Sequence, residues 1–346
     1  MTVPVYPAKP QPGDRVAVVS PSAGLPGLFP HVYELGLRRL RDELGLEPVE
    51  YPTTRVMGAD PRDRARDLTA AFADPTITAV LATVGGDDLI TVTPYLDDGV
   101  LRANPKPYFG YSDNTNVLNH LYRLGVVGYH GGSVLVHLGR SGKPHPLTLD
   151  SLRAALFTTG WYDLTAAPEW GDEPCDWRDP AALAEEPPMY PSDGWRWHGP
   201  ARVAQGRTWG GCLEIVHWLM ATGRVPSAAD LAGSVLVLET SNELPPAQEV
   251  FRIVRNMGER GLLADVPAIV VGRPKAWDFD RPHSVAERLA WAADQRAAIL
   301  SALAPYAGDP VVVFDVDLGH TDPQLIIPYG GEIRVDAVER RIAVRY

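Results

Sequence analysis

The chain contains little cysteine and no long apolar run. Its 346 residues include two cysteines, Cys175 and Cys212, whose separation fits no metal-binding motif and is more typical of two reduced thiols than of a disulfide. No apolar run reaches the roughly 18 residues that a membrane-spanning helix needs. Residues 1–20 also lack a basic segment followed by an apolar one. We therefore expect a cytoplasmic protein with no membrane partner.

Positive charge is also scarce. Lysine and arginine number 32 against 43 aspartates and glutamates, which gives a formal net charge of −11. Binding to a nucleic-acid polymer rests on clustered basic residues, so this balance argues against such a partner and leaves only single nucleotides as candidate ligands of that kind. Three of the histidines, His130, His137 and His145, are fairly close in sequence, but their spacing matches no metal motif. We predict neither a metal nor any other cofactor.

A serine stands between a short apolar run and a helical pattern in the segment 107–116, Pro-Tyr-Phe-Gly-Tyr-Ser-Asp-Asn-Thr-Asn. The apolar residues after it recur at helical spacing: Val117, Leu118, Leu121 and Leu124. This order predicts a strand, a tight turn at Ser112 and a helix. A helix N-terminus offers unpaired N–H groups and partial positive charge to an oxyanion, so a nucleophilic serine would fit there. The alternative is an ordinary N-cap, in which Ser112 accepts a hydrogen bond from the backbone N–H of Asn114 or Thr115.

Two further residues of catalytic type follow apolar runs that predict buried strands. The run 235–238 ends in Glu239, and the run 311–314 leads through a polar segment to His320. Ligands of open α/β sheets bind beyond the carboxyl ends of the strands, so these residues and Ser112 could form a triad. In a triad, a neutral histidine takes the serine proton and the carboxylate holds the histidine in the required tautomer. The alternatives are a loop histidine and a solvated carboxylate.

Several short motifs follow one another along the chain. They are residues 13–22, Gly85-Gly86, residues 110–115, Gly210-Gly211, the strand ending in Glu239, residues 319–321 and residues 327–331. In this order they resemble the LD-carboxypeptidase family of serine peptidases. The resemblance implies that Ser112 is the nucleophile, Glu239 the triad carboxylate and His320 the general base. It also implies an oxyanion hole made by the backbone amides of Gly86 and Asp113, and a homodimer.

The resemblance leaves the substrate open between two branches of the family. One branch contains murein tetrapeptide carboxypeptidases of cell-wall recycling, and the other resembles the microcin C immunity peptidase, which gives self-immunity to an antibiotic. The tryptophan-bearing segment 169–197 looks like the second branch, with Trp170 and Trp177 as candidates for stacking on a nucleobase. The same tryptophans could instead fill a seam between domains. The sequence departs from the family pattern at two places, with Asp87-Asp88 after the glycine pair and Cys212 after Gly211. Substrate contacts at these two places therefore do not carry over from the family.

Short apolar strands alternate with helical patterns along the chain, which predicts an α/β fold with a parallel sheet and helices on both of its faces. The family resemblance implies a flavodoxin-like N-terminal domain and a smaller C-terminal α/β domain of barrel character. We assign residues 1–165 to the nucleophile-bearing domain and residues 166–200 to a linker and substrate loop rich in Trp and Pro. Residues 201–346 form the domain that carries Glu239 and His320, so the active site is expected in the cleft between the domains.

These observations predict a serine carboxypeptidase or amidase. It would hydrolyse an amide bond in a small peptide or a peptide–nucleotide conjugate, with an aminoacyl-nucleotide as a candidate substrate. A murein tetrapeptide carboxypeptidase is the alternative enzyme. A catalytically silent protein that binds a small ligand in the cleft is the alternative from a different class.

Overall fold

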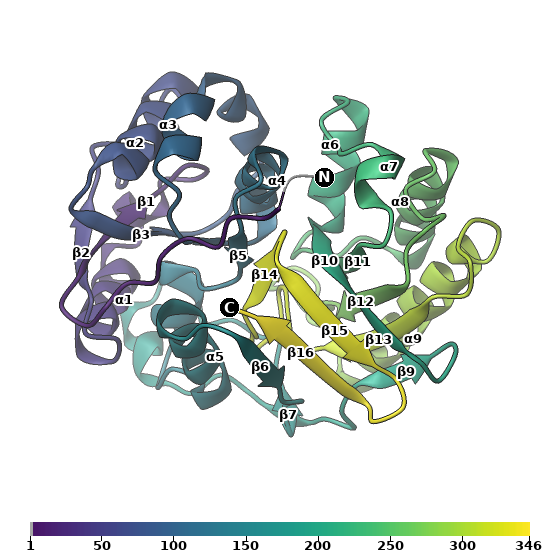
Figure 1. Ribbon diagram of the computed structural model, residues 1–346. Helices are drawn as coiled ribbons and strands as arrows, with labels where there is room; N and C mark the ends of the chain where they lie inside the picture. The colour runs from purple at the N-terminus through teal and green to yellow at the C-terminus, as the bar shows by residue number, and fades with distance from the viewer. Residues whose placement is uncertain (1–2) are drawn as a thin grey trace.

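Two β-sheets organise the computed structural model, which describes residues 3–346 (Figure 1). The first sheet has six strands in the order β14-β5-β4-β3-β1-β2. Its strands are β1 (Arg15–Val19), β2 (Glu47–Glu50), β3 (Ile77–Ala82), β4 (Tyr108–Gly110), β5 (Gly128–His130) and β14 (Ile327–Tyr329). The first five pair in parallel, and β14 joins the edge antiparallel to β5. Five parallel strands therefore end at one edge of this sheet, where Ser112 follows β4.

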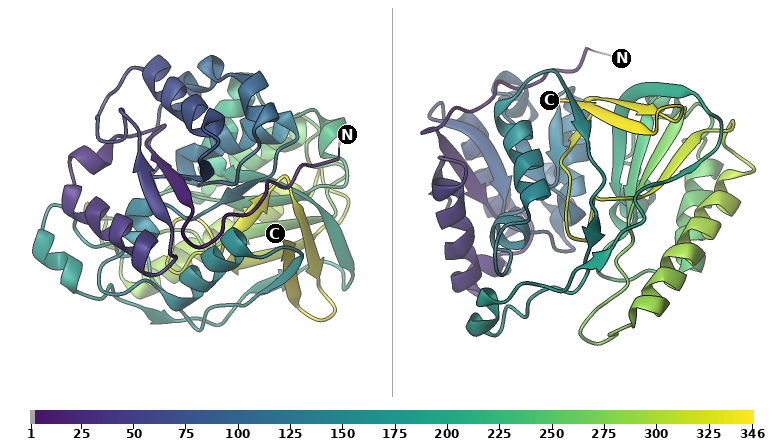
Figure 2. Two further views of the ribbon diagram at one scale, coloured as in Figure 1. Left: turned by 60° about the vertical axis from the view of Figure 1, so that its left-hand side comes forward. Right: turned by 90° about the horizontal axis from the view of Figure 1, so that it is seen from below.

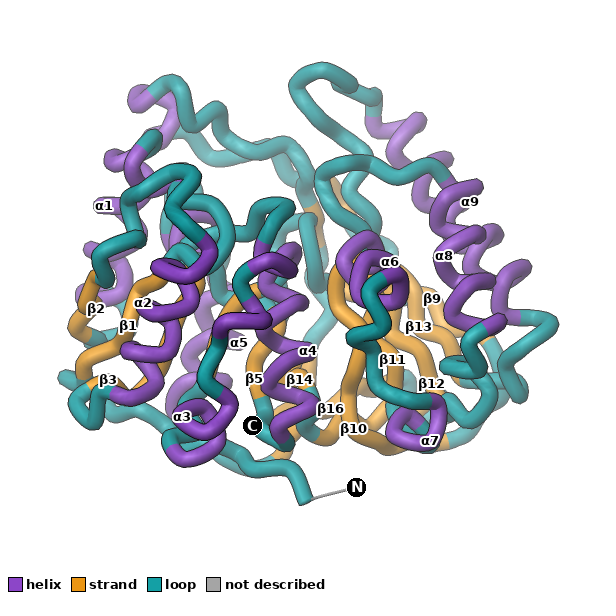
Figure 3. The backbone as a smooth tube through the Cα atoms, turned by 90° about the horizontal axis from the view of Figure 1, so that it is seen from above, coloured by secondary structure: helices purple, strands orange, loops and turns teal. Residues whose placement is uncertain are grey.

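Helices cover both faces of the first sheet. They are α1 (Pro30–Asp42), α2 (Pro61–Ala73), α3 (Asp98–Ala103), α4 (Thr115–Leu124) and α5 (Pro146–Phe157). Alternate residues of β1 separate the two faces, because Ala17 packs in one core cluster with α2 and α4 while Val18 packs in the other with α1 and α5. Figure 3 shows this order of helices around the strands. The predicted sheet with helices on both faces is confirmed.

The second sheet has eight strands in the order β6-β16-β15-β10-β11-β12-β13-β9. Its strands are β6 (Trp161–Leu164), β9 (Arg196–His198), β10 (Val203–Cys212), β11 (Val235–Glu239), β12 (Ala268–Gly272), β13 (Val311–Val316), β15 (Glu332–Asp336) and β16 (Arg341–Arg345). Strands β10 to β13 run parallel at its centre, and the outer strands pair antiparallel. Its helices are α6 (Leu213–Ala221), α7 (Ala228–Leu231), α8 (Ala247–Glu259) and α9 (Val285–Leu303). Within residues 3–346 the eight strands are hydrogen-bonded to one another in this order, with the parallel strands at the centre.

The chain crosses between the two halves more than once. β14, from near the C-terminus, completes the first sheet, while β6 and β9 join opposite ends of the second. The segment between them holds the two-stranded sheet of β7 (Glu169–Trp170) and β8 (Tyr190–Pro191), and it runs along the side of the molecule that is seen from below in Figure 2. The predicted ranges 1–165, 166–200 and 201–346 do not coincide with the two sheets. β6 falls in the first range and lies in the second sheet, whereas β14 falls in the last range and lies in the first sheet.

None of the helices in the described part of the chain is long and apolar enough to cross a membrane.

Candidate active site

Ser112 occupies a strained turn between β4 and α4. Its φ angle of 60° lies in the left-handed region, which costs free energy for a residue with a side chain. The N-cap interpretation is wrong, because α4 begins after Asn114 and no side chain caps it or the 3₁₀ turn at 112–114. A Cβ atom placed on Gly85 would lie 2.8 Å from the Cβ and Oγ atoms of Ser112. Strain and a close glycine are features of a nucleophile elbow.

The glycine pair that is predicted to supply part of the oxyanion hole lies close to this turn. A Cβ atom on Gly85 would also come within 3.3 Å of the backbone nitrogen of Asp113, and one on Gly86 would lie 2.2 Å from Ser22 Oγ. The loop after β3 thus passes close to the backbone of the serine turn, and only glycine fits there. The Asp113 carboxylate points into the protein, where it accepts hydrogen bonds from Ser22 Oγ at 2.5 Å and from the backbone N–H of Leu89 at 2.9 Å. Burial raises the pKa of this carboxyl group, and these hydrogen bonds oppose the rise. The Asp113 side chain therefore braces the turn, which leaves its backbone amide as the part suited to an oxyanion.

Glu239 and His320 form a close pair. The Glu239 side chain ends β11 and is 1% exposed, and its Oε2 accepts a hydrogen bond from His320 Nδ1 at 2.6 Å. Burial alone would raise the pKa of Glu239, but the charge and hydrogen bond of His320, together with the electrostatic attraction of nearby His130, outweigh it and lower the pKa to about 2. Gly319 permits the approach, since a Cβ atom there would lie 2.6 Å from Glu239 Oε2. The pair holds His320 with its Nε2 atom available for another partner.

The serine turn and the Glu–His pair meet across the two sheets. The ring of Tyr111, the residue before Ser112, lies 4.9 Å from the His320 ring between centroids. At the start of α4, Thr115 Oγ1 accepts a hydrogen bond from the backbone N–H of Cys212 at 3.2 Å, which fixes α4 against the end of β10. No direct hydrogen bond between Ser112 and His320 is formed in residues 3–346, and such bonds are often long in enzymes without substrate. The fold therefore brings the three predicted residues to one region.

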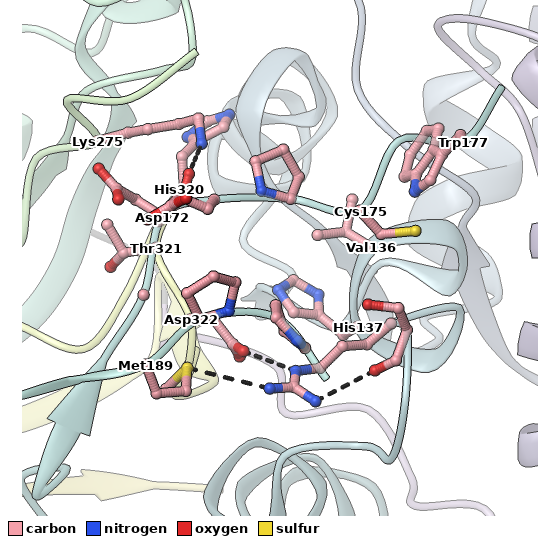
Figure 4. Close-up of a pocket in the computed structure, with 18 of the residues that line it drawn as sticks. Val136, His137, Asp172, Cys175, Trp177, Met189, Lys275, His320, Thr321 and Asp322 are labelled. Atoms are coloured by element: carbon pink, nitrogen blue, oxygen red, sulfur yellow. Dashed lines mark hydrogen bonds and ion pairs between the residues drawn. The ribbon is translucent and has the colours of Figure 1, made fainter. Parts of the chain in front are cut away.

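A pocket opens beside His320, and of the two candidate tryptophans only Trp177 is among the residues that line it (Figure 4). Trp177 lines this pocket, half-buried, with its ring 5.5 Å from Phe29 in an edge-to-face contact. Trp170 is 4% exposed and is not among the lining residues. The Arg273 guanidinium lies 5.1 Å from its ring centre, and Tyr190 packs beside it at 5.8 Å. Trp177 is thus placed to contact a ligand, while Trp170 is engaged in packing.

Charged residues that the sequence analysis missed also line the pocket. Arg140 is committed to ion pairs with Asp322 at 2.6 Å and Glu186 at 2.8 Å. Lys275, just after β12, donates to the backbone carbonyl of Asp172 and forms no ion pair within residues 3–346. Burial lowers the pKa of Lys275 to about 8, against the smaller opposing effect of nearby carboxylates. Its position after a predicted strand was a signal that the sequence analysis could have used.

Two parts of the chain match the models of a known protein family. Residues 16–131 match the LD-carboxypeptidase N-terminal domain, and residues 205–335 match the LD-carboxypeptidase C-terminal domain. These matches cover more than half of the chain. The chain therefore belongs to the LD-carboxypeptidase family and is a serine-type carboxypeptidase, as the sequence motifs predicted.

Individual relatives come from both branches of the family. The microcin C7 self-immunity protein MccF of Escherichia coli is 25% identical over 82% of this chain and 78% of its own. The murein tetrapeptide carboxypeptidase of Pseudomonas aeruginosa is 35% identical over 42% of this chain and 48% of its own. Among solved structures, the MccF-like protein from Streptococcus pneumoniae in complex with AMP matches with a TM-score of 0.84 and 26% identity, covering 96% of this chain and 99% of that one.

Proposed function

We propose that the protein hydrolyses an amide bond through a triad of Ser112, His320 and Glu239. The observation that carries this proposal is the 2.6 Å contact between Glu239 and His320 beside a strained serine turn. Ser112 Oγ attacks the carbonyl carbon while His320 Nε2 takes its proton. The backbone amides of Asp113 and of the loop at Gly85-Gly86 receive the oxyanion.

The cycle closes with the same residues. When the tetrahedral intermediate collapses, the C–N bond breaks and His320 gives its proton to the leaving amine, which leaves an ester on Ser112. Water then attacks the ester, His320 takes the proton of that water, and the acid product departs as the proton returns to Ser112. Glu239 stays ionised throughout and holds the imidazolium.

The pocket favours a substrate with an anionic group near the scissile bond and a flat group further away. Figure 4 draws Lys275 and His320 at one end of the pocket and Trp177 at the other. An ammonium group near the reacting end suits a carboxylate or a phosphate-like group, and an indole suits a nucleobase. We therefore favour an aminoacyl-nucleotide or peptide–nucleotide amide, in keeping with the AMP in the solved streptococcal neighbour.

The second candidate is cleavage of a murein tetrapeptide, which the Pseudomonas relative favours. A murein peptide offers a terminal carboxylate to Lys275 but no base to Trp177. The two candidate functions are distinguished by measuring kcat/KM for a murein tetrapeptide and for an aminoacyl-nucleotide amide, with Ser112→Ala as the control. Faster hydrolysis of the nucleotide conjugate supports the favoured substrate. Faster hydrolysis of the tetrapeptide overturns it in favour of the cell-wall substrate, and hydrolysis that survives in Ser112→Ala overturns the triad itself. A protein that binds both compounds and cleaves neither is the silent binding protein.

The homodimer and the cytoplasmic location stay predictions. Sedimentation at micromolar concentration tests the dimer, and a species of 37.7 kDa alone would contradict it.

A further inference from the structure

His130 is a buried histidine whose ring has no hydrogen-bond partner. It ends β5, is 1% exposed, and neither Nδ1 nor Nε2 is hydrogen-bonded within the described residues. In the parallel pairing of β4 and β5 it lies opposite Gly110, two residues before Ser112. A buried imidazole without partners is costly, so its position calls for a reason beyond packing.

The nearest carboxylate to this ring is the one in the proposed triad. His130 Nε2 lies 3.6 Å from Glu239 Oε1, an oxygen that also has no hydrogen-bond partner and belongs to a fully buried side chain. The other oxygen, Oε2, is taken by His320. A ring nitrogen that can donate and a carboxylate oxygen that can accept, both buried and without a partner, thus face each other at a distance slightly longer than a hydrogen bond. Catalytic contacts of this length in enzymes without substrate often tighten in the complex.

We infer that His130 is a positioning residue that holds Glu239 from the sheet carrying the nucleophile, by donating from Nε2 to Oε1. The inference rests on the proposed triad. Glu239 belongs to the second sheet and Ser112 follows a strand of the first, so a contact between β5 and β11 sets the two parts of the triad relative to each other. In this arrangement Glu239 accepts one hydrogen bond from each histidine.

By donating to Oε1, His130 changes the charge that Glu239 presents to His320. A neutral ring that donates to Glu239, or a charged ring beside it, withdraws part of the negative charge that Glu239 presents to His320. Loss of His130 therefore leaves more negative charge on Glu239 facing the His320 ring. The other ionisable groups near His130 are Tyr111, whose ring lies 6.0 Å away, and His137, while Cys212 and Glu214 lie on the Glu239 side. All of them stay in place when His130 alone is replaced.

The test compares His130→Leu with His130→Gln, whose amide nitrogen can replace Nε2 as donor. The readout is the rate of covalent labelling by a fluorophosphonate between pH 5 and 9, a range that includes the ordinary histidine pKa of about 6.5. We expect His130→Leu to label roughly tenfold to a hundredfold more slowly, by analogy with the loss of a residue that orients a metal ligand through a hydrogen bond. Its acid limb should move to higher pH, and His130→Gln should recover most of the rate.

His120→Leu serves as the matched control, because His120 on α4 contacts Asp98 and lies outside the proposed site. If His130→Leu keeps the wild-type rate and acid limb, or if His130→Gln is as slow as His130→Leu with an unmoved limb, the inference is overturned. Labelling that persists in Ser112→Ala would instead count against the triad itself, so the two failures are distinguishable.

Discussion

Replacement of Glu239 by Gln tests the part of the site that the structure defines most sharply. The change keeps the size of the side chain and removes its charge. In the wild-type protein the carboxylate accepts a hydrogen bond from His320 Nδ1–H at 2.6 Å, which leaves Nε2 free to take the serine proton. An amide can present its NH₂ group to Nδ1, and His320 then carries its proton on Nε2 and cannot act as the base.

The expected loss is large in kcat and small in KM. An equivalent carboxylate-to-amide change in the serine protease template lowers kcat by about 10⁴, or about 5 kcal/mol of transition-state stabilisation. Lys275 and Trp177 are untouched, so substrate binding should change little. Steady-state kinetics of Glu239→Gln against wild type measure both constants. A kcat within about tenfold of wild type would refute the orienting role of Glu239.

The same variant tests the charge state of Glu239. Its folded pKa of about 2 is below the ordinary value of 4.5, so the ionised carboxylate stabilises the folded protein fully above pH 4.5. That contribution is lost as the pH falls from about 4.5 towards 2. Urea titrations of wild type should show this fall in the free energy of unfolding between about pH 4.5 and 2. Glu239→Gln has no carboxylate to titrate at this position, so the part of the fall that is due to Glu239 should be absent. Identical pH dependence in the two proteins would mean that Glu239 is not held as a buried anion.

The remaining predictions concern the two tryptophans, Lys275 and the absence of a metal from the proposed mechanism. Trp177→Ala should raise KM for an aminoacyl-nucleotide by about fivefold to a hundredfold, from roughly 1–3 kcal/mol of stacking, and barely affect a murein peptide. Trp170→Ala should instead lower the melting temperature and affect both substrates alike, since Trp170 packs against Arg273; a selective KM effect there would reverse the assignment. Lys275→Met should weaken anionic substrates about tenfold or more, and in wild type their KM should rise above pH 8, as the ammonium loses its proton. Activity should survive EDTA, and activity restored by zinc would contradict the serine mechanism.

The strand pattern explains why the candidate residues of the proposed triad could be picked out from the sequence. The run at 235–238 is uniformly apolar because β11 is buried on both faces, and a polar residue directly after such a strand lies at the ligand-binding edge of the sheet. By the same rule His320 follows β13 and Lys275 follows β12, so both were candidates for the ligand-binding edge. Only His320 was named as a candidate from the sequence. The alternation of strands and helices predicted the α/β fold for the same reason.

Other features depend on contacts that sequence patterns do not carry. The sequence of a helix N-cap and that of a strained serine turn are alike at Ser112, and the φ angle decides between them. Trp170 and Trp177 belong to one segment of the sequence and look alike there. The structure distinguishes them, because Trp170 packs against Arg273 whereas Trp177 lies beside Phe29 and lines the pocket. His130 was weighed only as a metal ligand, because its proximity to Glu239 arises from the meeting of two sheets. The pairing of β14 with β5 is equally long-range.

Identification of the residue that a fluorophosphonate modifies tests the central claim most directly. The purified protein is labelled, digested and analysed by mass spectrometry, alongside Ser112→Ala and His320→Ala. Our account predicts a single modified residue, Ser112, no labelling of Ser112→Ala and strongly slowed labelling of His320→Ala. Labelling at another residue, or undiminished labelling of Ser112→Ala, would contradict it.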